Sequence, residues 1–420
     1  MALLIKNATL LSKKKADILI ESGRIAKIGT SLSSTGAEKL DASGKLLLPG
    51  FINTHTHAAM TLFRGVGEDR TFHGWLSAVR ALETKVTPQQ IRAGSELACI
   101  EMVKSGTTCF NDMYFYMDEL AGAVKEIGMR AVLGYSMVDM GDEKKRKLEL
   151  EICEKFIKDW QGKADGRITC SVPPHSLYLC SRELLEASRD LSAKYKVQLH
   201  IHLSETRKEV FDCLSAHKKR PVYYLDSLGI LSSRTVAAHC VWFTKEEIKL
   251  LSSRGVSASL NTVSNLKLAG GGIAPLPEME EAKMNISLGT DGSASNNSLS
   301  MFEAMKFTSL CVKNARWDAS VAKEHHMVSY ATEGGARALG IQAGEIKEGK
   351  LADMILLDAK AANLVPHHDL YSNIVFSANA GNVTDSIING KLVMENRKLL
   401  TMDEEKAIER AEKAVEKLEK

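Results

Sequence analysis

The sequence lacks the features that mark several specialised classes of protein. None of its eight cysteines lies in a Cys-x-x-Cys pair, so we interpret them as scattered, reduced and mostly buried thiols of a cytoplasmic protein. No run of about 20 apolar residues is present, and no helix is therefore expected to span a membrane. The first seven residues contain no apolar core long enough for a signal peptide.

An excess of one charge is also absent. The chain has 55 Lys and Arg against 52 Asp and Glu, and the formal net charge of +3 is too small to indicate nucleic-acid binding. The predicted binding region carries no Lys/Arg-rich run. With 44% hydrophobic and 25% charged residues, the composition is that of an ordinary soluble globular protein. We expect neither nucleic acid nor a membrane among its partners.

The middle of the chain alternates strand-like and helix-like segments. The strand candidates are the run that ends at His55 and residues 107–113, 130–138, 168–172, 197–203, 235–242, 256–260 and 285–289. Helix-like stretches intervene, for example at 88–104, 148–160, 181–194 and 245–253. This α/β alternation is typical of βαβ units, and eight units over about 250 residues fit a (β/α)8 TIM-like barrel. A doubly wound open sheet is the competing interpretation, but no Gly-x-Gly-x-x-Gly follows the first strand.

Short β-rich runs at both ends flank this middle part, at 3–5, 17–20, 24–28, 352–357 and 383–391. We predict one small β-sandwich domain built from residues 1–49 plus 345–400 and a catalytic barrel over 50–344. Residues 401–420 are predicted to form a C-terminal surface helix. Its apolar stripe of Ile408, Ala411, Val415 and Leu418 would pack on the body of the protein.

Residues suited to chemistry lie where the predicted strands end. His55 and His57 close the apolar run 46–57, and residues i and i+2 of a strand point to the same face. The pair therefore places two imidazoles at the carboxyl end of a strand, where a barrel enzyme would hold a metal. Two buried, hydrogen-bonded histidines are the simpler alternative. The other strand ends carry further candidates, namely His175, His200, His202, Glu205, His239 and Asp291.

Three imidazoles and one carboxylate suit a borderline divalent metal such as Zn2+, with one position left open for water. Such an ion lowers the pKa of water to about 7. Each candidate also has a simpler interpretation. Of His200 and His202 only one need bind metal, Asp291 could cap a helix, Glu205 could serve a helix dipole, and His239 could be a core residue. Their coincidence at the ends of four strands favours the metal site.

Several stretches resemble the amidohydrolase superfamily. More narrowly, they resemble the 5′-methylthioadenosine/S-adenosylhomocysteine deaminases, including the archaeal 5′-deoxyadenosine deaminases. The matching residues are 49–65, 174–176, 202–206, 238–240, 264–269, 288–297 and 349–353, so the resemblance covers nearly the full length. The His-x-His pair is shared across the superfamily, whereas the Ser-Asn-Leu-Lys-Leu and Thr-Asp-Gly-x-x-Ser-Asn-Asn runs are more specific.

This resemblance implies a role for each site residue. One divalent ion, Zn2+ with Fe2+ as the alternative, would be bound by His55, His57, His202 and Asp291. Asp291 would also take a proton from the attacking water. Glu205 would shuttle a proton to the base ring, and His239 would lie against the water. Pro173-Pro174-His175 occupies the place where two-metal relatives carry a bridging lysine or acid, so a single metal is expected.

The resemblance also implies the substrate contacts. Glu83 matches a contact to the ribose hydroxyls and His175 a contact to the adenine, while Glu205 and Asp291 lie at the reacting ring. Arg146 falls near the family's arginine for the distal end of the substrate, although Lys144 and Lys145 are its neighbours. Trp75 would line the pocket.

The predicted activity is hydrolytic deamination of a 5′-modified adenosine to the inosine analogue and ammonia. The expected substrates are 5′-deoxyadenosine, 5′-methylthioadenosine, S-adenosylhomocysteine and adenosine itself, as in nucleoside salvage. A guanine deaminase or a triazine-type hydrolase would use the same metal set, but Glu83 and His175 favour a nucleoside. A non-catalytic assembly subunit is disfavoured because all four ligands and Glu205 are present. A homo-oligomer, either dimer or tetramer, is expected by resemblance.

Overall fold

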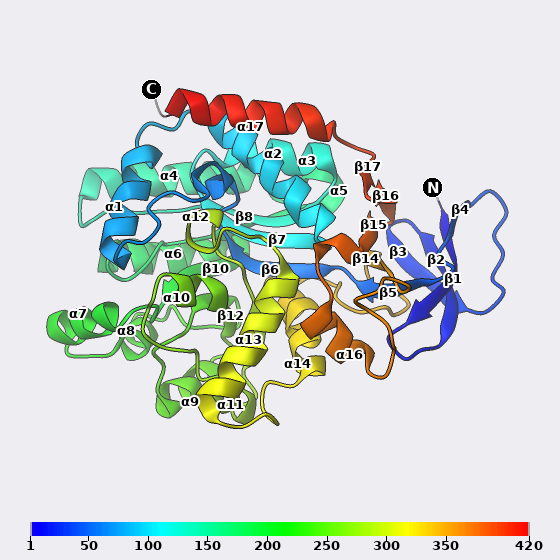
Figure 1. Ribbon diagram of the computed structural model, residues 1–420. Coiled ribbons are helices and arrows are strands. Elements are labelled where there is room, and N and C mark those ends of the chain that lie inside the picture. The colour runs from blue at the N-terminus through cyan, green and yellow to red at the C-terminus, as the bar shows by residue number, and fades with distance from the viewer. Residues whose placement is uncertain (1, 419–420) are drawn as a thin grey trace.

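The computed structural model describes residues 2–418, and its centre is a ring of eight parallel strands (Figure 1). These strands are β6 (Phe51–Thr56), β7 (Thr107–Tyr114), β8 (Arg130–Tyr135), β9 (Ile168–Val172), β10 (Gln198–Leu203), β11 (Thr235–His239), β12 (Ser257–Leu260) and β13 (Asn285–Leu288). Their order in the sheet equals their order in the chain. The ring is closed beyond β13 by the bond from Asp291 N to His55 O at 2.9 Å. The predicted (β/α)8 barrel is confirmed, and the open doubly wound sheet is wrong.

Helices connect the strands and cover the outside of the ring (Figure 1). The main ones are α1 (Phe72–Glu83), α2 (Pro88–Lys104), α3 (Met117–Ile127), α4 (Glu143–Trp160), α6 (Arg182–Tyr195), α7 (Arg207–His217), α8 (Pro221–Ser227), α9 (Lys245–Ser253), α13 (Met301–Arg316) and α14 (Glu324–Ser329). Shorter ones are η1 (Ala58–Phe63), α5 (Lys163–Gly166), α10 (Thr262–Lys267), α11 (Leu276–Glu281), α12 (Ser293–Asn296), η2 (Tyr330–Gly334), α15 (Gly335–Leu339), α16 (Leu370–Ser372), η3 (Asn373–Ser377) and η4 (Ala380–Asn382). Across residues 2–418, no helix has both the length and the apolar character needed to cross a bilayer.

Local capping sets where the helices begin. Thr87 and Gln90 form a reciprocal capping box at the start of α2. The bounds of α2 match the helix predicted at 88–104. The helix predicted at 148–160 begins earlier, at Glu143, because the Asp142 side chain accepts a hydrogen bond from Lys145 N and caps the chain there. The first turn of α4 is charged, so the spacing of apolar residues did not indicate that the helix begins there.

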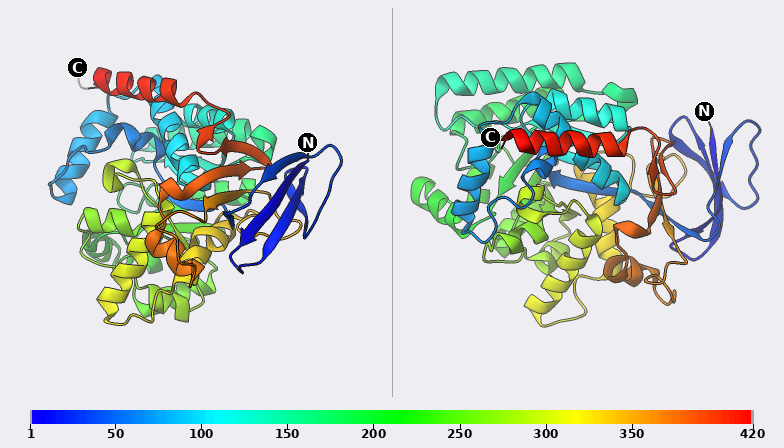
Figure 2. Two further views of the ribbon diagram at one scale, coloured as in Figure 1. Left: turned by 45° about the vertical axis from the view of Figure 1, so that its right-hand side comes forward. Right: turned by 45° about the horizontal axis from the view of Figure 1, so that its top comes forward.

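Strands from both ends of the chain build the second sheet (Figure 2). They are β1 (Leu3–Leu10), β2 (Lys15–Glu21), β3 (Arg24–Gly29), β4 (Glu38–Asp41), β5 (Lys45–Pro49), β14 (Met354–Asp358), β15 (Val383–Ile388), β16 (Lys391–Glu395) and β17 (Lys398–Leu399). β5 joins the two halves, since it pairs parallel with β1 and antiparallel with β14. The small domain expected from both termini is therefore confirmed, and its hydrogen bonds run unbroken through β5. Its exact limits at 49 and 345 stay a prediction.

The mixed sheet lies at the amino-terminal end of the barrel strands. β5 runs directly through Gly50 into β6, and Gly50 N donates to Asp353 O at 3.1 Å. Arg130, the first residue of β8, forms a bidentate ion pair with Asp353, with Nε to Oδ2 at 2.6 Å and Nη2 to Oδ1 at 3.2 Å. The carboxyl ends of the strands, on the opposite side, are therefore left for a site.

The C-terminal helix α17 (Glu404–Leu418) lies along α2 (Figure 1). Arg410 pairs with Glu96, and Gln90 Nε2 donates to Ala414 O at 3.0 Å. The buried positions are Ala407, Ala411, Ala414 and Leu418. Ile408 is 39% exposed, so its place in the predicted stripe is wrong. The helix turns its small residues inward because they allow close approach to α2. Residues 419 and 420 of the predicted helix lie outside the described residues.

The Arg130–Asp353 pair offers a test of how the two sheets are joined. Both side chains are buried, so Asp353→Asn would leave a guanidinium without its counter-charge and lower the free energy of unfolding by about 3–5 kcal/mol. Urea denaturation followed by circular dichroism measures this. Lys208→Met, which breaks the exposed Lys208–Asp212 pair, should change stability by less than about 0.5 kcal/mol. If Asp353→Asn unfolds at the same urea concentration as the wild type, the Arg130–Asp353 pair does not stabilise the junction of the two sheets.

Candidate metal and catalytic site

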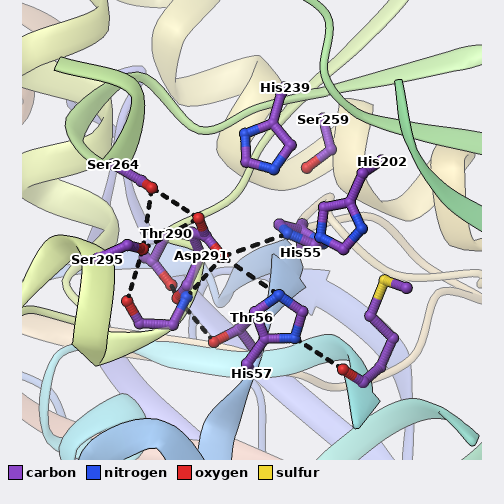
Figure 3. Close-up of polar contacts among 12 residues, drawn as sticks. His55, Thr56, His57, His202, His239, Ser259, Ser264, Thr290, Asp291 and Ser295 are labelled. Atoms are coloured by element: carbon purple, nitrogen blue, oxygen red, sulfur yellow. Dashed lines mark hydrogen bonds and ion pairs between the residues drawn. The ribbon is translucent and has the colours of Figure 1, made fainter. Parts of the chain in front are cut away.

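Three histidines meet at the carboxyl ends of β6 and β10 (Figure 3). The ring centroid of His55 lies 4.9 Å from that of His57 and 4.8 Å from that of His202. One nitrogen from each ring lies within 4.8 Å of the other two. The i, i+2 spacing of the first pair has therefore placed both rings on the inner face of the barrel, and His202 comes from across the ring.

Asp291 follows β13 and supplies a carboxylate to the same centre (Figure 3). Its Oδ1 lies 3.4 Å from Nε2 of His55 and 3.4 Å from Nε2 of His57. The cap residue of the following helix α12 is Gly292, so the simpler interpretation of Asp291 as a helix cap is wrong. Although burial alone would raise its pKa, the close contact with His55 and the charge interactions with the nearby histidines hold the pKa of Asp291 well below its usual range.

The outer nitrogens of these rings are already occupied. His57 Nδ1 donates to Met113 O at 2.7 Å, and His202 Nδ1 donates to His175 O at 2.7 Å. Because a carbonyl oxygen only accepts, each ring carries its proton on Nδ1 and presents the Nε2 lone pair inward. His200 does not join the centre, since its Nε2 lies 2.9 Å from His55 Nδ1 and thus supports that ring.

The donor set fits a divalent metal. His55 Nε2 is buried and has no hydrogen-bond partner among the described residues, which is rare for a polar atom unless something else binds there. Burial lowers the pKa of His55 to about 4, so the ring is neutral and can donate its lone pair. Three imidazole nitrogens and one carboxylate oxygen are ligands that a borderline divalent cation accepts. The chain therefore has a built centre for a divalent metal ion.

Glu205 and His239 lie beside this centre. Glu205 Oε1 is 3.8 Å from His239 Nδ1, and that nitrogen also bonds Asn265 Oδ1 at 2.8 Å. Burial raises the pKa of Glu205, and the nearby Asp291 adds to this rise. Burial would lower the pKa of His239, but Glu205 and Asp291 turn the net shift upward. The pair is thus arranged for proton transfer or for hydrogen bonding to a charged group.

A cavity of about 400 Å³ opens onto these side chains. It is lined by the predicted residues His57, Trp75, Glu83, His175, His202, Glu205, His239 and Asp291. Trp75 Nε1 donates to Ala294 O at 3.0 Å, which fixes the indole against the cavity wall. Residues from β6, α1, β10, β11 and the end of β13 therefore converge on one space, as the resemblance implied.

Arg146 is not brought into this group. It stands in the first turn of α4, where Nη1 lies 3.5 Å from Asp139 Oδ2 and 3.4 Å from Ser181 Oγ. Arg146 pairs with the buried Asp139 carboxylate and is not among the residues that line the cavity, so its contact with the substrate stays a prediction. Arg80 of α1 lines the cavity instead. Arg80 lies one turn before Glu83 on the same helix, so the two side chains share a face, and this spacing could have predicted that Arg80 lines the cavity.

Two further contributions were missed from the sequence. Tyr114 OH donates to Glu83 Oε1 at 2.6 Å and holds that carboxylate at the cavity wall. Ser264 and Ser295 both donate to Asp291 Oδ2, at 2.6 and 3.0 Å, so Oδ1 is left facing the histidines. Ser264 is the first residue of the Ser-Asn-Leu-Lys-Leu run, and its hydrogen bond to Asp291 gives a structural reason for that motif.

Comparison with known proteins places the chain in a family. A sequence model of the amidohydrolase family matches residues 46–393. The chain is 46% identical over 421 residues to a protein of Methanosphaera stadtmanae named 5′-deoxyadenosine deaminase, with 99% of each chain covered. A protein of Methanocaldococcus jannaschii with the same name is 43% identical over 418 residues, again with 99% of each chain covered.

Solved structures show the same architecture. An adenosine deaminase from Xanthomonas campestris with bound zinc superposes with a TM-score of 0.93 at 31% identity, covering 99% of this chain and 98% of the other. Atrazine chlorohydrolase from Arthrobacter aurescens TC1 complexed with zinc gives 0.92 at 24% identity, covering 98% and 100%, and supports the fold alone. The family match over most of the length and the close full-length relatives lead to one conclusion: the chain belongs to the amidohydrolase family.

Proposed function

We propose that this protein is a metal-dependent hydrolase that deaminates 5′-modified adenosines, with 5′-deoxyadenosine among its substrates. The observation that carries the proposal is that His57, His202, Asp291 and Glu205 line one cavity of about 400 Å³, while the buried His55 lies in the same cluster of metal donors. A cavity of this size is large enough for a nucleoside. The names of the full-length relatives support the choice of substrate.

We assign His55, His57, His202 and Asp291 as the ligands of one Zn2+ ion, with Fe2+ as the alternative. When bound, a divalent ion there supplies a Lewis acid that lowers the pKa of water to about 7. The zinc in the adenosine deaminase relative supports this choice. Ser264 and Ser295 donate to Asp291 Oδ2 and Gly292 N donates to Oδ1, so the carboxylate is held in place, and we assign it to accept the proton that the attacking water loses.

Glu205 is assigned as the acid that protonates purine N1. Its raised pKa favours the protonated form, and its carboxyl lines the cavity beside His239. Protonation of N1 makes C6 electrophilic, and water oxygen then adds to C6. A hydrogen bond from His239 stabilises negative charge on that oxygen. The proton that Asp291 accepted passes to N6, the C6–N6 bond breaks, and ammonia leaves. The hydroxyl on C6 then gives its proton to the Glu205 carboxylate, so that the inosine analogue remains and both carboxyl groups return to their starting state.

Three side chains are assigned to hold the nucleoside. Glu83, fixed by Tyr114, would accept hydrogen bonds from the ribose hydroxyls through its remaining oxygen. His175 would contact the adenine, and Trp75 forms the cavity wall. A free base has no ribose for Glu83 to bind, so this arrangement favours a nucleoside over guanine or a triazine. By family resemblance we also propose a dimer or tetramer, which light scattering on the purified protein tests.

A substrate panel tests the function. Ammonia release by metal-loaded protein should give measurable kcat/KM values for 5′-deoxyadenosine, methylthioadenosine, S-adenosylhomocysteine and adenosine. Guanine and a chlorotriazine should give values at least about 100-fold lower, because they leave Glu83 without a partner. Turnover of guanine or the triazine that exceeds turnover of every adenosine would overturn the proposal.

Arg80 gives a prediction about the 5′ substituent. It forms no ion pair with any residue in 2–418 and faces the cavity beside Glu83, whereas Arg146 is held by Asp139. Arg80→Met should lower kcat/KM about 10-fold for S-adenosylhomocysteine, whose tail ends in a carboxylate, and less than about 2-fold for 5′-deoxyadenosine. Arg146→Met is the matched control and should leave the ratio of the two values unchanged. The reverse pattern would return the role to Arg146.

A further inference from the structure

Glu209 is a buried carboxylate that the proposed reaction does not use. It lies in the first turn of α7 and is 4% exposed. Both of its oxygens bind backbone: Ser204 N donates to Oε1 and Glu205 N donates to Oε2, each at 2.9 Å. One side chain therefore holds the amides of two consecutive residues, and the second of these carries the carboxyl assigned as the catalytic acid.

The segment that Glu209 holds has an unfavourable conformation. Ser204 has φ of +52°, in the left-handed region that residues with a side chain rarely adopt. Such a conformation persists only where the surroundings hold it in place. On its other side, Ser204 O accepts a bond from Trp242 N at 3.0 Å. The turn between β10 and α7 is thus held by hydrogen bonds on two sides. Glu209 accepts both bonds from the amides of Ser204 and Glu205, and Trp242 N donates the bond to Ser204 O.

A helix cap alone would not need this arrangement. Thr206 caps α7, since its Oγ1 accepts a hydrogen bond from Glu209 N at 3.2 Å. In an ordinary capping box the Glu side chain would reach back to the amide of the cap residue. Here it reaches further, to the two residues before Thr206. Burial raises the pKa of Glu209 to about 7 although both N–H groups favour the carboxylate, so the charged form is held there at a cost in free energy.

The side chain of Glu205 has little else to hold it. No residue in 2–418 forms a hydrogen bond with its carboxylate, and its nearest charged partner is His239 at 3.8 Å. The position of its backbone therefore contributes directly to where that carboxylate lies. We propose that Glu209 is a positioning residue, which fixes the backbone of Ser204 and Glu205 and so aims the Glu205 carboxyl at the substrate ring. This inference rests on the proposed role of Glu205.

Glu209→Gln tests the inference, because it keeps the size of the side chain but replaces one acceptor oxygen with an amide group that cannot accept. We expect kcat to fall about 10- to 100-fold, KM to change less than about 2-fold, and metal content to stay the same. Glu183→Gln, at an exposed first-turn position of α6, is the matched control and should leave all three values unchanged.

A double-mutant cycle separates positioning from general stability. If Glu209 acts through Glu205, then Glu209→Gln should change kcat less than about 2-fold when Glu205 is already Gln. The same loss in both backgrounds would overturn the inference. Ser204→Gly should restore part of the lost kcat, because glycine tolerates a positive φ without support. No recovery in that combined variant would also count against it.

Hydrogen exchange provides a measurement that does not depend on turnover. Peptides that contain Ser204 and Glu205 should exchange faster in Glu209→Gln than in the wild type, whichever substrate the enzyme uses. Faster exchange without adenosine deamination would contradict the proposed function but keep the positioning role. Unchanged exchange would overturn the positioning role. If Glu209→Gln does not fold, Glu209→Asp replaces it, since the shorter carboxylate cannot reach both amides.

Discussion

Glu205→Gln is expected to lower kcat by about 10²- to 10⁴-fold while the protein still binds its metal. The glutamine keeps the shape of the side chain but has no acidic proton to give to the purine ring. Metal binding should persist because Glu205 is not among the side chains whose donor atoms cluster to hold an ion. Steady-state ammonia release gives kcat, and elemental analysis gives metal per chain.

The loss should appear mainly in kcat. Glu205 takes part in the proton transfer, whereas Glu83, His175 and Trp75 are assigned to binding, so KM for 5′-deoxyadenosine should change only a few-fold. Glu183→Gln again serves as the control for loss of a carboxylate elsewhere. Unchanged turnover in Glu205→Gln would remove the proton role. Lost metal would show that the carboxylate helps to build the centre.

The barrel and the metal-donor set could be predicted because both depend on regular geometry. Buried parallel strands give apolar runs, and their carboxyl ends meet at one end of a barrel. His55 and His57 share a face through the two-residue period, so the chain pattern alone placed them together. The strand ends also offered His202 and Asp291 as candidates, but the choice of His202 over His200 and of Asp291 as a ligand came from the family resemblance.

The cavity walls could not be predicted in the same way. Arg80 and Glu83 lie on α1, whose place over the barrel depends on contacts such as the bond from Trp75 to Ala294 O. No sequence period reports a contact between residues so far apart in the chain. The pairing of Arg146 with the buried Asp139 could not be predicted for the same reason, since Asp139 lies in a loop whose path is set by packing. The apolar pattern did not predict which face of α17 is buried, because that face is set by the small side chains that let the helix approach α2 closely.

The Ser-Asn-Leu-Lys-Leu run shows how a motif can be recognised before its purpose is known. Two consecutive residues of α10 contact two different parts of the site. Ser264 donates to Asp291 Oδ2, and Asn265 Oδ1 bonds His239 Nδ1. Lys267, one turn on, bonds Glu68 at 2.5 Å in the loop before α1. A short helix outside the metal-donor set therefore ties together Asp291, His239 and the loop before α1.

Asp291→Asn is expected to reduce turnover by about 10³-fold or more and to lower the metal content of dialysed protein. The amide keeps the shape, and its oxygen can still accept hydrogen bonds from Ser264 and Ser295. Its NH2 group would replace only the acceptor for Gly292 N, so the local fold should hold. The amide lacks the negative charge that offsets a divalent ion, and it cannot take a proton from water. Metal per chain and kcat, measured on the same samples, test both effects.

Ser264→Ala is the matched control for this variant, because it removes one of the two hydroxyls on Oδ2 and leaves the carboxylate in place. Loss of such an outer contact should weaken metal affinity or activity by about 10- to 100-fold, well short of the loss in Asp291→Asn. Competition with a chelator ranks the affinities of the wild type and both variants. Because Oδ1 lies 3.4 Å from two histidine nitrogens, Asp291→Asn protein with full metal and near-normal turnover would mean that these side chains do not share one ion.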